Sequence, residues 1–416
     1  MEEDSGNLIN SIWSQELDLP PSCVEFCPAH PSYFLVGTYN LEKDDVEVSL
    51  EKEAVNDDDD DEKSQVVKPK KTQSRNGSIL AFQLQDDNSI VLIQTEPQSS
   101  ALLDLHFNSN EGFRDICATV SSTATLTVFR LSPGVGDNKP LKHLNTMDIA
   151  SLSGGEISAT EGSEILFLSL CWHPSRPDML AITTNTGYVY LVHLSAWDKG
   201  WKLHTEPAIT HTLEAWTVNL SPNLGVTDAP DDVSFRIFSG GDDSKLRFGT
   251  ATWNPFDDLL TETISAVEAR GHDAGVTAIL PLFTQDDGSE LLVTGSYDEN
   301  VRLFSLAPYG RPKNLIEMGL GGGVWRLKLI NLDKTPDDSY HWRAQILASC
   351  MHTGPRVVEV LQTADGEHHF RVLGRFEEHK SMNYGSDFHP KSKDKLTVVS
   401  TSFYDRLLCL WKLELS

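Results

Sequence analysis

Short apolar runs of strand length recur along the whole chain, separated by stretches rich in Gly, Asp, Asn and Ser. The clearest group lies at 271–306, where Val276–Leu282, Leu291–Gly295 and Val301–Leu306 follow one another. These runs are too short for helices and are rich in Val, Leu, Ile and Phe, which favours β-strands. Such a unit cannot bury its own faces, so the rest of the chain should supply similar neighbours.

The third run of this unit carries a large apolar residue, and equivalent runs recur at intervals of 47 to 63 residues. The equivalent positions are Phe82, Phe129, Val192, Phe248, Phe304, Val358 and Trp411. Together with the opening pair Gly271-His272, the spacing resembles the WD repeat. Seven repeats predict an all-β fold, a seven-bladed WD-repeat β-propeller that spans residues 1–416 as a single domain.

Turn residues add detail to this prediction. The residue six places before the apolar position is an Asp in three units, at Asp242, Asp298 and Asp405. In WD repeats the histidine of Gly-His pairs with this Asp and pins the blade. We therefore expect His272 to bond Asp298 and His379 to bond Asp405, whereas Asp242 lacks a recognisable partner.

The pattern also predicts how the ring closes and where it is interrupted. The chain ends soon after the seventh unit's third strand, so we expect Ile9–Leu17 to supply the missing outer strand. A strongly acidic stretch at 41–76 is predicted to be a disordered loop between the second and third strands of blade one. A Gly- and Ser-rich stretch at 133–163 is predicted to be a second loop insertion.

Composition narrows the class of function. The chain has 416 residues and a formal net charge of −27, which argues against nucleic-acid binding. No apolar run reaches the length of about 18 residues needed for a membrane span, and no secretory signal is recognisable. The six Cys are scattered and form no zinc set. We expect a cytoplasmic monomer with reduced thiols, no metal and no cofactor.

Candidate chemistry gathers on the predicted face that carries the entry loops and turns of blades five to seven. His352 occupies a turn position without a Gly-His partner, where its imidazole could take a proton; the alternative is that it caps its own turn. Cys350 could be a nucleophile, although a Cys on a strand is more often a buried apolar residue. Amides at Gly321–Gly323 could stabilise an oxyanion, or the glycines could simply form a tight turn.

Three motifs carry a more specific resemblance. They are GGGVWR at Gly321–Arg326, CMHTG at Cys350–Gly354 and NYGSDFHP at Asn383–Pro390. Together they resemble the diphthine methylesterase family, a family of WD-repeat enzymes of diphthamide biosynthesis. The resemblance is strongest over Gly240–Trp411, and the N-terminal half matches mainly in its propeller pattern.

This resemblance implies hydrolysis of the methyl ester of methylated diphthine, a modified histidine on translation elongation factor 2. Other diphthamide-pathway enzymes are further expected partners. The substrate's trimethylammonium group suits aromatic faces and carboxylates. The alternative is a non-catalytic scaffold or trafficking adaptor. The expected catalytic residues are His352, Cys350 and Arg326. The expected substrate-binding residues are Gly322, Gly323, Trp325, Tyr384, Asp387, Asp298 and Tyr404.

Overall fold

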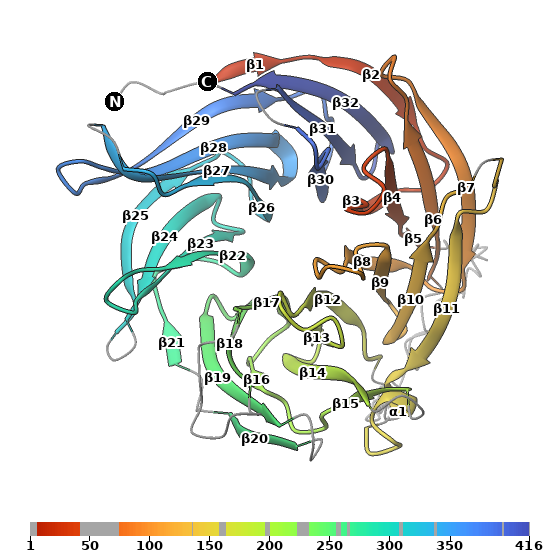
Figure 1. Cartoon of the computed structure of the whole chain (residues 1–416), viewed down its shortest axis with the longest axis horizontal. Coiled ribbons are helices and arrows are strands. Elements are labelled where there is room, and N and C mark those ends of the chain that lie inside the picture. Colours follow the sequence, from red (N-terminus) through yellow and green to blue (C-terminus); the bar gives the residue numbers. More distant parts are fainter. Residues whose placement is uncertain are drawn as a thin grey trace, which may run out of the picture.

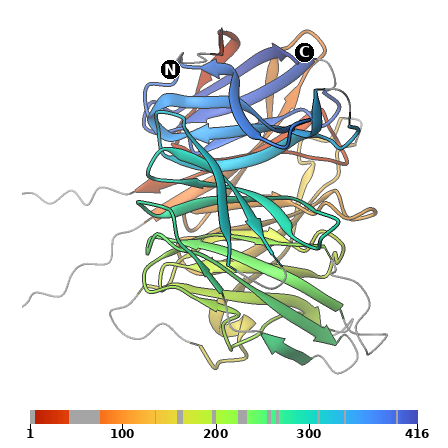
Figure 2. The same cartoon turned by 90° about the vertical axis from the view of Figure 1, so that its left-hand side faces the viewer.

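The computed structural model describes the chain in a series of segments. They are residues 6–41, 75–134, 136–157, 164–195, 200–222, 233–254, 259–263, 267–307, 311–336, 339–392 and 395–415. Seven β-sheets form a ring around a central channel, as the sequence predicts (Figure 1). Seen from the side, the sheets of blades four, five and six follow one another along the rim (Figure 2).

The first strand of each blade lies next to the channel, and later strands lie progressively further out. Blade one contains β3 (Pro21–Phe26), β4 (Tyr33–Thr38), β5 (Asn40–Leu41), β6 (Arg75–Leu84) and β7 (Ile90–Gln98). Blade two contains β8 (Leu102–Phe107), β9 (Ile116–Ser121), β10 (Thr125–Leu131) and β11 (Leu141–Asp148). Blade three contains β12 (Phe167–Trp172), β13 (Met179–Thr184), β14 (Tyr188–Ser195), β15 (Gly200–Leu203) and β16 (Ile209–Thr210).

The second half of the chain builds the remaining four blades. Blade four contains β17 (Ala215–Leu220), β18 (Val233–Gly241), β19 (Leu246–Asn254), β20 (Leu259–Thr263) and β21 (Val267–Ala269). Blade five contains β22 (Val276–Thr284), β23 (Glu290–Ser296), β24 (Asn300–Leu306) and β25 (Lys313–Gly319). Blade six contains β26 (Val324–Asp333), β27 (Tyr340–Cys350), β28 (Gly354–Thr363), β29 (His368–Phe376) and β1 (Asn7–Ile9). Blade seven contains β30 (Gly385–Phe388), β31 (Lys395–Ser402), β32 (Leu407–Glu414) and β2 (Ser11–Glu16).

The apolar residue of each third strand is buried in all seven blades, as its recurrence predicts. These side chains pack with residues of adjacent blades into shared clusters, so each blade completes its neighbour's core. In blade four the predicted position is displaced by one residue. Ser239 pairs with Arg247 there, as Thr294 pairs with Arg302 in blade five. The structural equivalent of Phe304 is therefore Gly249, and the position predicted as Phe248 is wrong by one.

The N-terminal strand closes the ring as expected. β2 pairs antiparallel with β32, which removes the exposed edge of blade seven. The structure adds a second contact, because β1 pairs parallel with β29 of blade six. The N-terminal segment therefore ties together the last two blades, and the backbone amide of Ser11 donates to Glu378 at 2.8 Å where it passes between them.

The two predicted insertions have different outcomes. Most of the acidic stretch, residues 42–74, lies outside the described residues, although it does join β5 to β6 between the second and third strands of blade one. The stretch at 133–163 is not loop throughout. It contains β11, the outer strand of blade two, and the short helix α1 (Ile149–Leu152), so this prediction is wrong over 141–152. β11 is exposed at six of its eight residues, so its sequence lacks the apolar alternation that marks a half-buried strand.

The predicted hydrogen bonds between His272 and Asp298 and between His379 and Asp405 are wrong, because each of these side chains bonds a different partner. His272 Nε2 contacts Thr294 Oγ1 at 2.8 Å, while Asp298 accepts a hydrogen bond from the amide of Asp273. In blade seven His379 Nε2 likewise contacts Ser400 Oγ at 2.8 Å, and Asp405 accepts from the amide of Lys380. The histidines bind the second strand, and the carboxylates bind the backbone that follows each histidine.

A direct contact between a histidine and a turn aspartate occurs in blade four, where none was predicted. His211 Nδ1 lies 2.9 Å from Asp243 Oδ1, and its Nε2 lies 3.0 Å from Ser239 Oγ. The turn aspartate that contacts the histidine, as expected of a WD repeat, is therefore Asp243 and not Asp242. Among the described residues, no helix is long and apolar enough to cross a membrane.

Candidate active site at the mouth of the channel

A row of aromatic side chains crosses the entry loops and turns of blades four to seven. Ring centroids lie 5.8 Å apart for Trp216 and Trp325, 5.9 Å for Tyr297 and Trp325, and 5.2 Å for Trp325 and Tyr384. Tyr384 continues the row to Phe403 at 5.4 Å. The predicted neighbours Trp325 and Tyr384 are thus in contact, and Trp216 and Tyr297 join them.

The turn that carries His352 lies beside this row. The amide of Met351 donates to Gly323 O at 2.9 Å, and the amide of Asn383 donates to Met351 O at 2.8 Å. These bonds hold the turn between the segments that lead to Trp325 and to Tyr384. The imidazole itself is exposed, and its Nε2 lies 3.8 Å from Glu299 Oε1.

The glycines before Trp325 allow this close packing. A Cβ on Gly322 would lie 2.6 Å from Thr353 Oγ1, and a Cβ on Gly323 would lie 2.9 Å from Met351 Sδ. A larger residue at Gly322 would displace Thr353, and one at Gly323 would displace the flexible Met351 side chain, which supports the tight-turn interpretation. A contribution of their amides to oxyanion stabilisation stays a prediction.

Cys350 does not fit the role of a nucleophile. Its side chain is fully buried in the core between blades five and six. Burial raises the pKa of the Cys350 thiol to about 12, so the reactive thiolate is disfavoured. The structure thus favours the alternative of a small buried apolar residue.

We expect Cys350 to resist alkylation by iodoacetamide at pH 8 while the protein is folded. A rise in thiol pKa from 9.0 to about 12 lowers the thiolate fraction roughly a thousandfold, and burial blocks access. Peptide mass spectrometry before and after denaturation checks this. Rapid labelling of Cys350 in the native protein would contradict the buried assignment.

The predicted substrate carboxylates are already engaged within the fold. Asp298 binds Arg302 at 2.9 Å and accepts from the amide of Asn300. Burial would raise the pKa of Asp298, but Arg302 and the amide donors outweigh it and lower the pKa to about 2. Asp387 is buried, with Oδ1 at 2.6 Å from Lys328 Nζ and Oδ2 accepting from the amide of Phe26. Neither carboxylate is therefore placed to bind a ligand.

A different carboxylate meets the aromatic row. Asp242 Oδ1 accepts a hydrogen bond from Trp216 Nε1 at 3.0 Å. Tyr404, also predicted to bind substrate, is 70% exposed and touches the row only through Phe403, with centroids 5.0 Å apart. Tyr404 therefore lies beyond the blade-seven end of the row, while Asp242 lies beside Trp216 at the blade-four end.

Arg326 connects the aromatic row to the channel. Its guanidinium carbon lies 5.2 Å from the centroid of the Trp325 ring, and Nη2 reaches across the channel to 3.2 Å from Asp104 Oδ1. Asp104 is buried on β8 and also accepts from Ser169 Oγ at 2.7 Å. Burial would raise the pKa of Asp104, but Arg326 and His106 outweigh it and hold the pKa well below its usual range.

His106, on the same strand, lies between two carboxylates. Its Nδ1 is 2.6 Å from Glu25 Oε2, and its Nε2 is 3.4 Å from Asp104 Oδ1. Burial would lower the pKa of His106, but these two carboxylates outweigh it and raise the pKa to about 10. The imidazole is therefore a cation at neutral pH and cannot serve as a general base there.

The charge network continues on the other side of Glu25. Lys328 Nζ lies 3.8 Å from Glu25 Oε1 in addition to its contact with Asp387. Burial would lower the pKa of Lys328, but Asp387 and Glu25 outweigh it and raise the pKa. Three carboxylates and three cations from blades one, two, six and seven thus meet in the channel.

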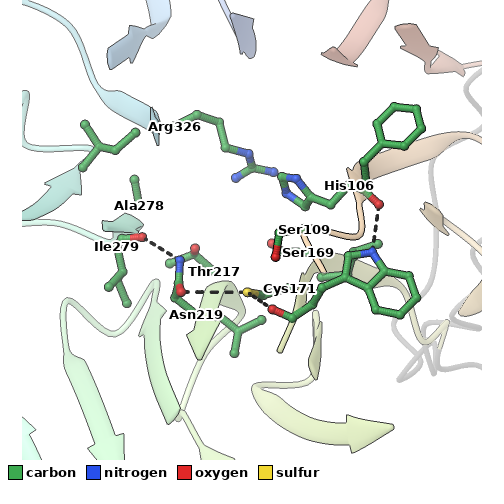
Figure 3. A pocket seen from close by; sticks show the side chains of 14 residues that line it. His106, Ser109, Ser169, Cys171, Thr217, Asn219, Ala278, Ile279 and Arg326 are labelled. Carbon is green, nitrogen blue, oxygen red and sulfur yellow. Dashed lines mark hydrogen bonds between the residues drawn. The ribbon is translucent and has the colours of Figure 1, made fainter. Parts of the chain in front are cut away.

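Two chambers lie on either side of the bridge formed by Arg326, Asp104 and His106. The first, here called the Thr217 chamber, has a volume of about 210 Å³ and is shown in Figure 3. The second, the Tyr384 chamber, has a volume of about 170 Å³ and is also lined by Glu25 and Lys328. Arg326 and His106 line both chambers.

Glu25, Asp104, His106 and Lys328 are not among the site residues that the sequence predicts. A signal was present, because charged and apolar residues alternate in CVEF, LDLHF and WRLK, as they do in strands with one face toward water. Only ring closure brings these first strands together, since the chain separates them by whole blades. No group of three or more His, Cys, Asp or Glu within the described segments is arranged to hold a metal ion.

Comparison with known proteins gives relatives over most of the chain, although no family model matches it. Diphthine methyltransferase of Saccharomyces cerevisiae is 25% identical over 94% of this chain and 95% of that protein. The Schizosaccharomyces pombe protein of the same name is 25% identical over 82% and 87%, and the human one is 22% identical over 91% and 74%.

Among solved structures, the WD40 repeats of RRP9 match with a TM-score of 0.56 at 11% identity, covering 98% of this chain and 100% of that one. This match supports the WD-repeat propeller fold alone. The sequence relatives confirm the resemblance carried by the motifs of blades six and seven: the chain is a homologue of the diphthine methyltransferases.

Proposed function

We propose that this protein is a carboxylic-ester hydrolase that acts on methylated diphthine of translation elongation factor 2. In this reaction water adds to the ester carbonyl carbon and methoxide leaves as methanol. The products are the diphthine carboxylate, methanol and one proton. The observation that carries the proposal is the aromatic row around Trp325, joined through Arg326 to the charged channel.

The aromatic row suits the trimethylammonium group of the substrate. Aromatic faces attract quaternary ammonium ions through their negative quadrupole, and desolvated sites gain about 2 kcal/mol. Trp216, Tyr297, Trp325 and Tyr384 present four rings within one contact chain, and Asp242 adds a negative charge beside Trp216. We assign to Asp242 the attraction of the ammonium group that the sequence predicted for Asp298 and Asp387.

Water is the acyl acceptor that we propose, although the relatives are named methyltransferases. The two channel chambers measure about 210 and 170 Å³. Pockets for ligands of drug or cofactor size usually measure about 300–1,000 Å³. The chambers therefore suit an amino-acid side chain with water better than a nucleoside-sized methyl donor or acceptor.

His352 is our proposed proton acceptor. Its turn is hydrogen-bonded to the segment that leads to Trp325, and Glu299 Oε1 lies 3.8 Å from its Nε2, near enough for a charge contact but too far for a direct hydrogen bond. A neutral imidazole oriented by a carboxylate is a common general base for water. Arg326 is the proposed stabiliser of the negative charge that develops on the carbonyl oxygen.

Purified protein incubated with elongation factor 2 that carries methylated diphthine tests this proposal. We expect the modified peptide to lose the mass of one CH2 group and methanol to appear in equal amount. Binding without any mass change would contradict hydrolysis and favour the alternative of a scaffold or adaptor. The same preparation without the protein controls for spontaneous hydrolysis.

Replacement of Trp325 by leucine should raise the KM for methylated elongation factor 2 about tenfold, with a smaller change in kcat. The reason is loss of a cation–π contact worth about 1–2 kcal/mol. Steady-state kinetics measure the effect, and Trp201→Leu on the outer strand β15 is the matched control. An unchanged KM would remove Trp325 from substrate recognition.

A further inference from the structure

The Thr217 chamber has an unusual charge lining. Its polar lining comes from two cations, Arg326 and His106, and from uncharged groups that include Ser169, Thr217 and Asn219. None of the described residues that line it is an Asp or Glu. Glu25 and Asp104 line the other chamber, and Asp104 also accepts from Ser169 Oγ and the amide of Leu170 in the wall of this one. A chamber lined in this way favours an anion.

Arg326 has hydrogen-bonding capacity to spare. A guanidinium carries five N–H donors. Among the described residues, its one hydrogen bond runs from Nη1 to Trp325 O at 3.4 Å. Nη2 is buried and near Asp104, yet it has no hydrogen-bond partner of adequate geometry. An oxygen ligand at this point would supply the hydrogen-bond acceptor that Nη2 lacks.

The same part of the molecule is close to the aromatic row. Arg326 directly follows Trp325 in β26, and Thr217 directly follows Trp216 in β17. The two indole rings lie 5.8 Å apart. A ligand that has a quaternary ammonium and a carboxyl group on the same carbon can therefore reach both the rings and Arg326.

We infer that the Thr217 chamber is an anion site that binds the ester carbonyl oxygen during hydrolysis and the carboxylate of the product. This inference rests on the proposed function and deepens it. Arg326 donates to the oxygen, and His106 adds positive charge at the wall of the chamber. Asp104 and Glu25 are positioning residues, because they orient His106 and Arg326 and keep His106 protonated.

Kinetics of variants test this assignment. Removal of one oxyanion donor commonly costs about 10²–10³-fold in kcat, so we expect Arg326→Met to lower kcat by about that factor. His106→Gln should lower kcat by at least tenfold. His143→Gln, on the exposed outer strand β11 of the same blade as His106, should leave kcat unchanged. Wild-type kcat in both channel variants would overturn the inference.

The pH profile separates a positioning role from a merely structural one. Glu25 of β3, Asp104 of its own strand, and Arg326 and Lys328 of β26 are the charged groups that face His106 or its partners. With both carboxylates present, activity should persist until the pH approaches the His106 pKa of about 10. Asp104→Asn should move this alkaline limb at least one pH unit lower, and Asp104→Glu should restore it. An unmoved limb in Asp104→Asn would count against the inference.

A binding experiment keeps the anion site distinguishable from the hydrolysis. Trimethylglycine combines a quaternary ammonium and a carboxylate on one carbon, and its methyl ester lacks the negative charge. We expect the wild-type protein to bind trimethylglycine more tightly than its methyl ester by NMR titration, and Arg326→Met to abolish the difference. Preference without hydrolysis would support the site and reject the enzyme, whereas hydrolysis without preference would do the reverse.

Discussion

Replacement of His352 by alanine is expected to lower the kcat for demethylation of elongation factor 2 by about 10²–10⁴-fold. General-base catalysis by a positioned side chain contributes an acceleration of this size. The side chain is exposed and packs against no core cluster, so the fold should be unaffected. Circular dichroism and the thermal unfolding midpoint provide the check on folding.

The kinetic comparison needs a control histidine away from the mouth of the channel. Glu299→Gln removes the only carboxylate that the described residues bring near His352 and should lower kcat less, because it acts through the imidazole. His30→Ala, in the loop between β3 and β4, should leave kcat unchanged. Full activity of His352→Ala would remove it as the base while leaving the reaction and the channel site intact.

The free energy of unfolding should decrease as the pH falls from about 6.5 to about 4. Burial lowers the pKa of His173, His272 and His379 to about 4 each, against an ordinary value of 6.5. Between these values the unfolded chain binds protons that the folded protein excludes, so acid favours unfolding. A shift of this size corresponds to about 3 kcal/mol for one histidine.

His106 should behave in the opposite sense. Its pKa is raised, so its contribution to stability is complete below pH 6.5 and is lost as the pH rises through about 10. Urea unfolding at a series of pH values measures both effects. His272→Asn should reduce the loss on the acid side by about 3 kcal/mol, whereas exposed His143→Asn should not change it. Identical acid-side slopes for His272→Asn and the wild type would contradict the buried neutral state.

The seven-bladed fold could be predicted from the sequence because the same pattern of short apolar runs recurs in each blade. Burial of a large apolar residue in each third strand is a local requirement, so residues such as Phe304 and Trp411 mark their blades without knowledge of the rest. The turn in blade four was misplaced by one residue because Asp242 and Asp243 are adjacent, and only the strand register shows which one meets His211.

Only the part of the site that lies in neighbouring blades could be predicted from the sequence. Trp325 and Tyr384 lie in motifs of neighbouring blades, so the fold alone places them together. The contact between Arg326 and Asp104 joins blade six to blade two across the channel, and no local pattern encodes such a distance. Cys350 shows the converse, because strand position favours burial over reactivity and the structure agrees.

The pairing of the first strands with the last blades sets an order on biosynthesis. β1 and β2 leave the ribosome before the other strands of the propeller, yet their partners β29 and β32 are among the last of these strands to emerge. Blades one to five can pack during translation, whereas the ring can only lock after the chain is nearly complete. Until then the early strands stay unpaired, and the nascent chain exposes two strand edges that a chaperone would have to shield.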